Sequence, residues 1–200
     1  MEELISKIEA LKGTLVQQTI DCRLREFASF RHRGDKEWFG ELCFCLLTAN
    51  ARADRAISIQ AQLGAEGFCH ACYEDVLECI VDHKHRFHNT KAKNILAARQ
   101  HSNIKSRIIE LVLYEGESGA RDWLVQNIRG IGYKEASHFL RNVGYNDLAI
   151  LDRHILRIAD ENGIIKELPG SLSRKTYLAI EEKLRSEERR VGKECTLRCR

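Results

Sequence analysis

The chain has 200 residues, of which 44% are hydrophobic, and a formal net charge of +3. This length is enough for one domain, or for two small lobes, with a core that is stable without covalent links. The slight positive charge fits contact with a nucleic acid over a limited face, and it argues against a protein that is basic over its whole surface.

The start of the chain and its cysteines bear on its location. Met1-Glu2-Glu3 opens an acidic amphipathic segment rather than a signal peptide. No apolar run approaches the roughly 18 residues that cross a bilayer. Eight cysteines in a chain with ordinary hydrophobic content indicate reduced thiols rather than a disulfide scaffold. We expect an intracellular protein of the cytoplasm or nucleoid, with no membrane contact.

Apolar residues recur at spacings of three and four along most of the chain, which predicts helices. In chain order these runs include Leu4, Ile8, Leu11 and Leu15, then Trp38, Leu42, Cys45 and Leu46, then Val76 and Ile80, then Ile108 and Leu111, and finally Ile155 and Ile158. No segment shows the alternation of a strand. We therefore predict an all-α protein of about ten helices and essentially no sheet, with residues 1–184 forming a single domain of two helical lobes.

The last 16 residues, 185–200, differ from the rest. They are strongly basic and lose the apolar periodicity, so the helical pattern is predicted to end near Leu184. We interpret residues 185–200 as a non-native or disordered tail; the alternative is a frayed end of the last helix.

A helix-hairpin-helix is predicted over about residues 120–144. An apolar helical run leads into Arg129-Gly130-Ile131-Gly132, and a second helix starts at Tyr133. Gly130 and Gly132 would allow a tight turn and the close approach of a DNA phosphate to backbone N–H groups at a helix N-terminus. The alternative is an ordinary helical hairpin with a glycine turn.

Lys134 and Asp152 are the candidate catalytic residues. Lys134 falls in the first turn of the second helix, and Asp152 follows 18 residues later. An amine can attack C1′ of a damaged nucleoside and remain bound as a Schiff base. A carboxylate can stabilise the positive charge that develops on the sugar. The alternative assigns Lys134 to the surface and makes Asp152 a simple helix N-cap.

Four segments carry a resemblance to a known family: 33–56, HRFHNTKAKNI (85–95), 128–144 with GIGYKEASHFLRNVG, and 148–157. The chain resembles the archaeal-type 8-oxoguanine DNA glycosylase/AP lyases, in the endonuclease III-like helix-hairpin-helix superfamily. The resemblance implies the two-lobed glycosylase fold, excision of 8-oxoguanine and strand cleavage by β-elimination. Lys134 falls on the family's catalytic lysine and Asp152 on its catalytic aspartate.

The same resemblance implies further contacts. Phe87 would stack on the extruded base; the alternative is a core phenylalanine at the start of a helix. The backbone carbonyls of Gln126, Ile128 and Ile131 could hold a monovalent cation. Side chains that could contact phosphate, each with the alternative of a solvated surface charge, are Lys91, Lys93, Arg52, Arg55 and Arg153.

No cofactor is expected to be required. An iron–sulfur cluster of this superfamily needs four closely spaced C-terminal cysteines, and this region has only Cys195 and Cys199. Zinc is not expected at Cys69 and Cys72, because a tight second pair of ligands is missing. Cys43, Cys45 and Cys79 are predicted to be small core residues.

The expected partner is double-stranded DNA with oxidised guanine or an abasic site, and the expected state is a monomer. Two other functions remain open at this point. One is a glycosylase for another oxidised base. The other is a noncatalytic helix-hairpin-helix DNA-binding module in which Lys134 has only a structural role.

Overall fold

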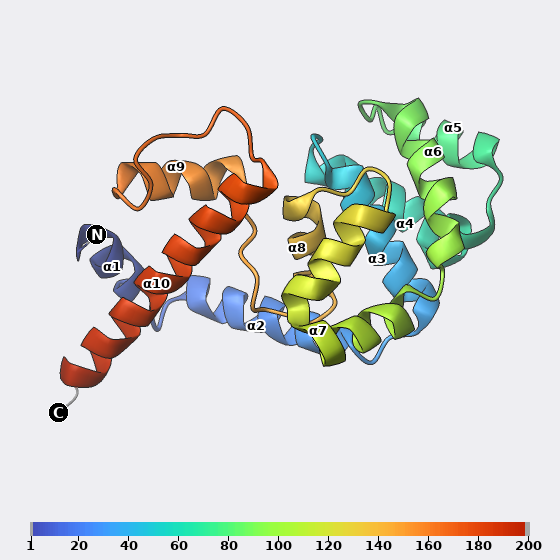
Figure 1. Cartoon of the computed structure of the whole chain (residues 1–200). Coiled ribbons are helices and arrows are strands. Elements are labelled where there is room, and N and C mark those ends of the chain that lie inside the picture. Colours follow the sequence, from blue (N-terminus) through green and yellow to red (C-terminus); the bar gives the residue numbers. More distant parts are fainter. Residues whose placement is uncertain (1, 199–200) are drawn as a thin grey trace. The chain divides into compact units, whose positions relative to one another are not determined.

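The computed structural model describes the backbone of residues 2–198 and the side chains of residues 3–189. Within residues 2–198 there are ten α-helices, one short 3-10 helix and no strand (Figure 1). The helices are α1 (Glu2–Glu9), α2 (Leu15–Phe30), α3 (Asp35–Thr48), α4 (Ala53–His70), α5 (Tyr73–Asp82), α6 (His88–Ala98), η1 (Arg99–His101), α7 (Ile104–Asn127), α8 (Tyr133–Asn142), α9 (Arg153–Glu161) and α10 (Arg174–Arg198). The all-α prediction is confirmed. None of these helices is both long enough and apolar enough to cross a membrane.

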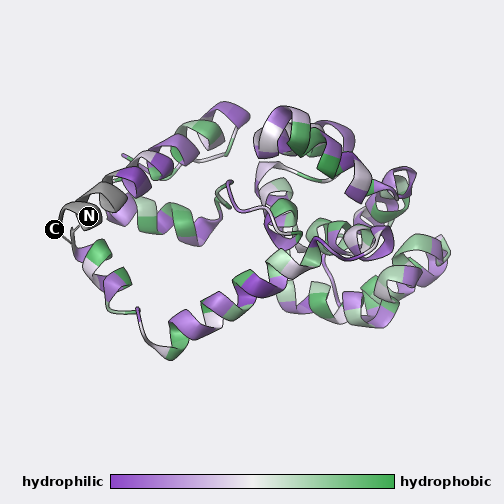
Figure 2. Cartoon of the chain, turned by 90° about the horizontal axis from the view of Figure 1, so that it is seen from below, coloured by the Kyte–Doolittle hydropathy of each residue, from purple (hydrophilic) through white to green (hydrophobic). Residues whose placement is uncertain are grey.

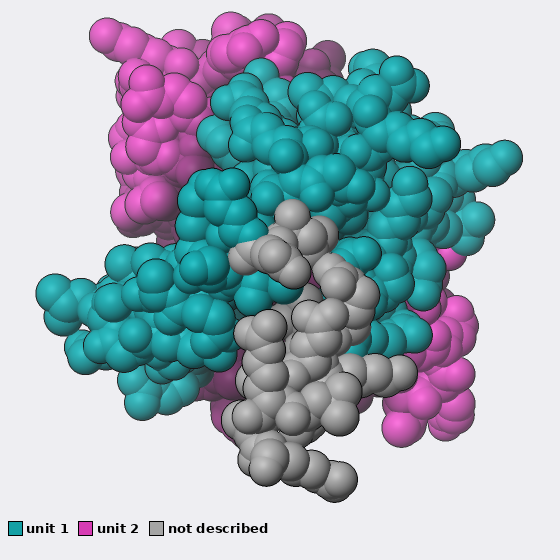
Figure 3. Space-filling model, turned by 90° about the vertical axis from the view of Figure 1, so that its left-hand side faces the viewer, with its two compact units in different colours: residues 1–25, 149–200 teal, residues 26–148 magenta. Residues whose placement is uncertain are grey.

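The chain divides into two compact units (Figure 3). Residues 26–148 form the first, which we call the central unit, and residues 1–25 with 149–200 form the second, the terminal unit. The whole helix-hairpin-helix lies in the central unit, whereas Asp152 belongs to the terminal unit.

The core of the central unit is built around α3, which packs against α4, α6, α7 and α8. The helices carry apolar and polar residues in turn along their length (Figure 2), as expected for helices that bury one face. Trp38 of α3 is fully buried, and its ring meets Phe139 and Tyr145 edge to face, with centroids 6.2 and 6.5 Å apart. Burial of side chains this large holds α8 firmly on α3.

The cysteines of the central unit are mostly core residues, as predicted. Cys43 and Cys45 are fully buried and Cys79 almost so. Burial raises the pKa of the Cys43 and Cys45 thiols well above the usual value. The described residues contain no group of three or more His, Cys, Asp or Glu side chains placed to hold a metal. Cys195 and Cys199 lie outside the described side chains.

The terminal unit is held together by Tyr177 of α10. Its hydroxyl donates to the carbonyl of Ala149 (2.6 Å) and accepts from the N–H of Leu151 (3.2 Å). Glu181, one turn further along α10, accepts from the N–H of Ala149 (2.9 Å). These bonds fix the segment that leads into α9 and therefore the position of Asp152 within this unit.

The end of the chain differs from the prediction. Helix α10 continues through Arg198, so the helical pattern does not end near Leu184 and residues 185–198 are not irregular. Arg and Glu favour helices even without an apolar face, and an ion pair between Glu182 and Arg189 (3.7 Å) supports this part of the helix. The side chains from residue 190 onward lie outside the described residues.

Candidate active site at the helix-hairpin-helix

The predicted hairpin joins α7 to α8. The N–H of Ile128 closes α7 on the carbonyl of Leu124 (2.9 Å), and the N–H of Ile131 donates to the carbonyl of Ile128 (3.2 Å). The first bond of α8 runs from Ala136 to the carbonyl of Gly132 (2.9 Å). The apolar residues on either side of the turn are all buried: Leu124, Ile128, Ile131, Ala136, Phe139 and Leu140.

The two glycines of the turn have different roles. Gly130 has φ +90°, in the left-handed region that favours glycine, and its α carbon lies tightly against Asn94. Gly132 has φ −104° and ψ −176°, which any residue can adopt. A β carbon on Gly132 would lie 3.2 Å from the carboxylate of Glu135. The prediction that both glycines permit the turn by their conformation is therefore correct for Gly130 only.

Lys134 is the second residue of α8, and its side chain is only 28% exposed. Its Nζ lies 3.6 Å from Oε1 of Glu135, whose side chain is more buried still. Tyr133 ties this turn to α7, because its hydroxyl donates to Asp122 (2.6 Å). A partly buried amine, held beside a glycine turn, does not fit the alternative of a solvated surface lysine.

Lys91 does not have the role predicted for it. Its side chain is buried, with 6% of the residue exposed, and Nζ donates to the carbonyls of Leu46 (2.6 Å) and Ala49 (2.8 Å) at the end of α3. Burial lowers the pKa of Lys91 to about 8; the charge of Glu135 raises it and that of Lys134 lowers it. An amine enclosed in this way cannot contact a DNA phosphate, so that prediction is wrong.

The other predicted phosphate contacts are at the surface or engaged within the protein. Lys93 and Arg153 are exposed. Arg52 pairs with Asp54 (2.9 Å), whereas Arg55 donates to the carbonyl of His83 (2.9 Å).

Phe87 precedes α6 in an unusual conformation. It occupies the left-handed region, with φ 59° and ψ 32°, and 52% of the residue is exposed. The guanidinium of Arg86 lies 5.0 Å from its ring centroid. The alternative of a core phenylalanine is wrong, and the exposed ring can accept a flat partner.

Asp152 caps α9. Its Oδ1 accepts from the N–H groups of His154 and Ile155, each at 2.9 Å. Asp152 is therefore the N-cap of α9. Because both bonds end on Oδ1, they fix the orientation of the carboxylate and do not involve Oδ2.

Sequence reasoning missed three buried or half-buried polar residues near this site: His85, Asn94 and Glu135. Lys91 and Asn94, three residues apart, lie on one face of α6, and both are buried. Their spacing with Ile95 and Ala98, which are also buried, is the signal that could have placed them on the inner face of the helix.

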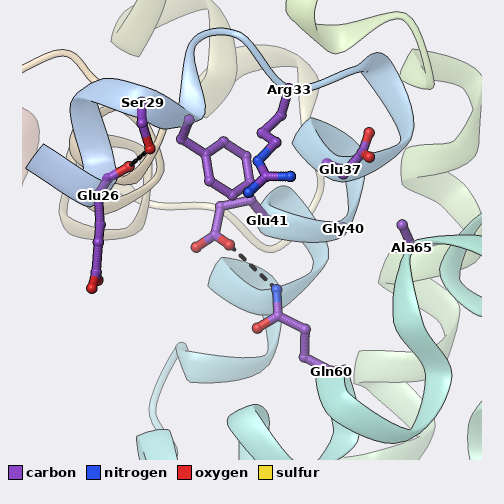
Figure 4. Close-up of a pocket in the computed structure, with 9 residues that line it drawn as sticks. Glu26, Ser29, Arg33, Glu37, Gly40, Glu41, Gln60 and Ala65 are labelled. Atoms are coloured by element: carbon purple, nitrogen blue, oxygen red, sulfur yellow. Dashed lines mark hydrogen bonds between the residues drawn. The ribbon is translucent and has the colours of Figure 1, made fainter. Parts of the chain in front are cut away.

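A separate cavity of about 370 Å³ in the central unit (Figure 4) includes none of the predicted site residues. It is lined by Glu26, Ser29, Phe30, Arg33, Glu37, Gly40, Glu41, Gln60 and Ala65. Burial raises the pKa of Glu41, against the effect of hydrogen bonds from Asn142 (2.5 Å) and Gln60 (3.3 Å). Since both carboxylate oxygens of Glu41 have donors, this group joins α3 to α8 and α4 and has a structural role.

Comparisons with known proteins identify the family of this chain. The 8-oxoguanine DNA glycosylase family matches residues 20–193. A relative from Methanocaldococcus jannaschii, named 8-oxoguanine DNA glycosylase/AP lyase, is 50% identical over 195 residues, which cover 98% of this chain and 90% of the relative. A relative of the same name from Korarchaeum cryptofilum is 41% identical, covering 96% and 90%.

Solved structures point to the same family. The M. jannaschii 8-oxoguanine glycosylase/lyase in complex with 15mer DNA containing 8-oxoguanine has a TM-score of 0.87 at 49% identity, covering 92% of this chain and 87% of that chain. The 8-oxoguanine DNA glycosylase of Thermotoga maritima has a TM-score of 0.82 at 38% identity, covering 92% and 86%. The chain therefore has the helix-hairpin-helix glycosylase fold and belongs to the 8-oxoguanine DNA glycosylase family.

Proposed function

We propose that this chain is a bifunctional DNA repair enzyme. It excises 8-oxoguanine from double-stranded DNA and then cleaves the strand at the abasic site by β-elimination. The observation that carries the proposal is the partly buried side chain of Lys134 in the first turn after the glycine turn, in a chain 50% identical to a named glycosylase/AP lyase.

Lys134 is the nucleophile in this proposal. Its neutral amine forms a bond to C1′ of the damaged nucleotide, and the base leaves with the electron pair of the glycosidic bond and takes up a proton. The sugar opens to a Schiff base on Nζ. Loss of a proton from C2′ then expels the 3′ phosphate, which cleaves the strand.

Asp152 acts in the first step. A carboxylate facing C1′ stabilises the positive charge that develops as the bond to the base breaks. The two bonds from α9 to Oδ1 support this role, because they fix the orientation of the carboxylate.

DNA is held mainly through its phosphates. The N–H groups at Gly130 and Gly132 and the start of α8 suit a phosphate, and Arg153 offers an exposed positive charge. The carbonyls of Gln126, Ile128 and Ile131 would hold a monovalent cation that screens the phosphate. Gln126 lies in the last turn of α7, where carbonyls have no donors within the helix. Ile128 and Ile131 follow that helix, and the carbonyl of Ile128 also accepts from the N–H of Ile131 (3.2 Å). No other cofactor is required.

The remaining parts of the proposal concern recognition of the damaged base and the oligomeric state of the enzyme. The target base must leave the stack, because the glycosidic bond is inaccessible within it. Phe87, a residue that is half exposed, stacks on the extruded base. The enzyme acts as a monomer on the DNA of the nucleoid.

Borohydride trapping tests the proposal. The parent protein, mixed with a duplex containing 8-oxoguanine and treated with borohydride, should form a covalent adduct. Lys134→Gln should form none, and Lys36→Gln, at an exposed lysine with no predicted DNA contact, should behave like the parent. An adduct with Lys134→Gln at the parent's level would contradict the assignment of the nucleophile.

Substrate choice needs a second comparison. A panel of duplexes with 8-oxoguanine, an oxidised pyrimidine or an abasic site separates the proposed enzyme from a glycosylase for another base. A parent protein that binds DNA but forms no adduct with any of these duplexes would be a noncatalytic DNA-binding module.

A further inference from the structure

The C-terminal end of α3 presents a group of backbone carbonyls to the segment that leads into α6. We call the carbonyl oxygens of Leu46, Leu47 and Ala49 the α3 carbonyl cluster. Lys91 Nζ donates to the first and third, and Nε2 of His85 lies 2.9 Å from the second. The end of a helix carries partial negative charge, so it attracts donors and cations of this kind.

The two side chains lie on either side of Phe87 in the sequence, and both act on its backbone. Nδ1 of His85 lies 2.6 Å from the carbonyl of Arg86, which forms the peptide bond to Phe87. The N–H of Lys91 donates to the carbonyl of Phe87 (2.9 Å). Both peptide groups of Phe87 therefore contact a residue that is anchored in the α3 carbonyl cluster.

Such restraint is needed because of the conformation of Phe87. A bulky residue in the left-handed region is a true outlier that persists only when its surroundings impose it. The ring itself contributes little to that restraint, because 52% of the residue is exposed. His85 and Lys91, by contrast, are almost completely buried.

We infer that His85 and Lys91 are positioning residues for base recognition, which anchor the 85–91 segment to the α3 carbonyl cluster and so hold the Phe87 ring ready to stack on the extruded base. The inference rests on the proposed function for its substrate, and its structural part can be tested without DNA. Neither residue needs to touch the base.

The chemistry of the two anchors suits this role. A lysine amine has at least two N–H groups in either protonation state, enough for both carbonyls. A neutral histidine can donate to one of its two carbonyls, whereas the imidazolium donates to both. Lys91→Met keeps most of the buried stem and removes the donors, and His85→Leu removes the ring donors.

The kinetic experiment compares two substrates under single turnover with enzyme in excess. Removal of 8-oxoguanine requires both Phe87 and Lys134, whereas cleavage at an abasic site requires no base contact. Lys91→Met and His85→Leu should slow excision about tenfold, within the range expected for a weakened base stack, as should the benchmark Phe87→Leu. Abasic cleavage should change by less than about twofold. The control Lys36→Met, at an exposed lysine with no assigned DNA contact, should change neither rate, as is usual for surface substitutions.

Two results would overturn the inference. One is an equal loss of the excision rate and the abasic cleavage rate in Lys91→Met and His85→Leu. The other is a normal excision rate in these two variants while excision by Phe87→Leu is slow. A merely structural role would lower the melting temperature and both rates together. Should Lys91→Met fail to fold, Lys91→Gln keeps two N–H donors on a shorter side chain and should give an intermediate, still selective, loss of excision.

Amide hydrogen exchange in the free protein gives the second readout. The amides of Lys91 and Ala92, in the first turns of α6, should exchange faster in His85→Leu, while buried amides of α7 keep the parent's rates. Unchanged exchange at Lys91 and Ala92 would overturn the inference. If the parent removed no 8-oxoguanine, the proposed function would fail, and this exchange measurement would still decide whether His85 fixes Phe87.

Discussion

The side-chain amide of Asn94, on α6, packs directly against the α carbon of Gly130 in the hairpin turn, so closely that a β carbon on Gly130 would overlap Nδ2. Asn94 is buried, which leaves it little room to move away. The turn that precedes Lys134 therefore packs against α6, the helix that begins directly after Phe87. A change at Gly130 should therefore affect the nucleophile through packing as well as through backbone strain.

Gly130→Ala should destabilise the protein by more than the roughly 1–3 kcal/mol expected from a strained conformation alone. Gly163→Ala is the matched control, because Gly163 also has positive φ (+70°) but open space around it. Chemical denaturation measures both. Combining Gly130→Ala with Asn94→Gly should recover part of the loss, and an additive double mutant would contradict the packing explanation.

Asp152→Asn should slow excision by about 2–4 kcal/mol of barrier, the scale of a lost electrostatic stabiliser. The amide oxygen can still accept from His154 and Ile155, so stability should change little. Single-turnover kinetics and a melting curve measure the two effects. A normal rate with a lowered melting temperature would reduce Asp152 to a helix cap.

Lys91 should make stability rise with pH above about 8. Its pKa in the folded protein is about 8, against an ordinary value of 10.5. Between these values the unfolded chain binds more protons, so a rise in pH favours the folded state; below pH about 8 both states are protonated and this dependence ends. The resulting rise in the free energy of unfolding should be of the order of 2 kcal/mol.

The measurement is the free energy of unfolding at pH 7.5 and 9.5, in the parent and in Lys91→Met. The parent should gain stability relative to Lys91→Met between the two pH values. Lys93→Met should follow the parent, because Lys93 is exposed. A difference that is constant with pH would show that Lys91 titrates normally.

A chain shortened after Leu184 should keep the parent's melting temperature within about 2 °C, because little apolar area would be lost. None of residues 185–189 is buried. Ile180→Ala is the comparison within the same helix, since Ile180 is buried and its truncation should cost about 2–5 kcal/mol. A large loss on shortening would show that the last turns of α10 pack against the protein.

Most of the fold could be predicted because the information is local. The spacing of residues such as Trp38, Leu42 and Leu46 shows both the helix and its buried face, and Gly130 and Gly132 mark the turn. The end of α10 was mispredicted for a related reason. A helix without an apolar face leaves no periodic pattern, although residues such as Glu182 and Arg189 support it through helix propensity and charge pairing.

The candidate site could be predicted only in part. Asp152 was identifiable as a cap from its place before an amphipathic helix. Lys91 looked like a surface lysine, because a sequence does not show that the end of a different helix lies against it. His85 and Asn94 were missed for the same reason: their partners, Leu47 and Gly130, are far away in the chain and are brought close by tertiary packing.

The burial of Cys43 and Cys45 has a consequence for an enzyme that works where guanine is being oxidised. Peroxide reacts with thiolates that it can reach, and these two sulfurs are enclosed and remain protonated because burial raises their pKa. Among the cysteines that the structure describes, Cys22 and Cys72 are exposed and would react first. Oxidants of the kind that create 8-oxoguanine would therefore oxidise the exposed thiols of Cys22 and Cys72 and leave the buried thiols of Cys43 and Cys45 unmodified.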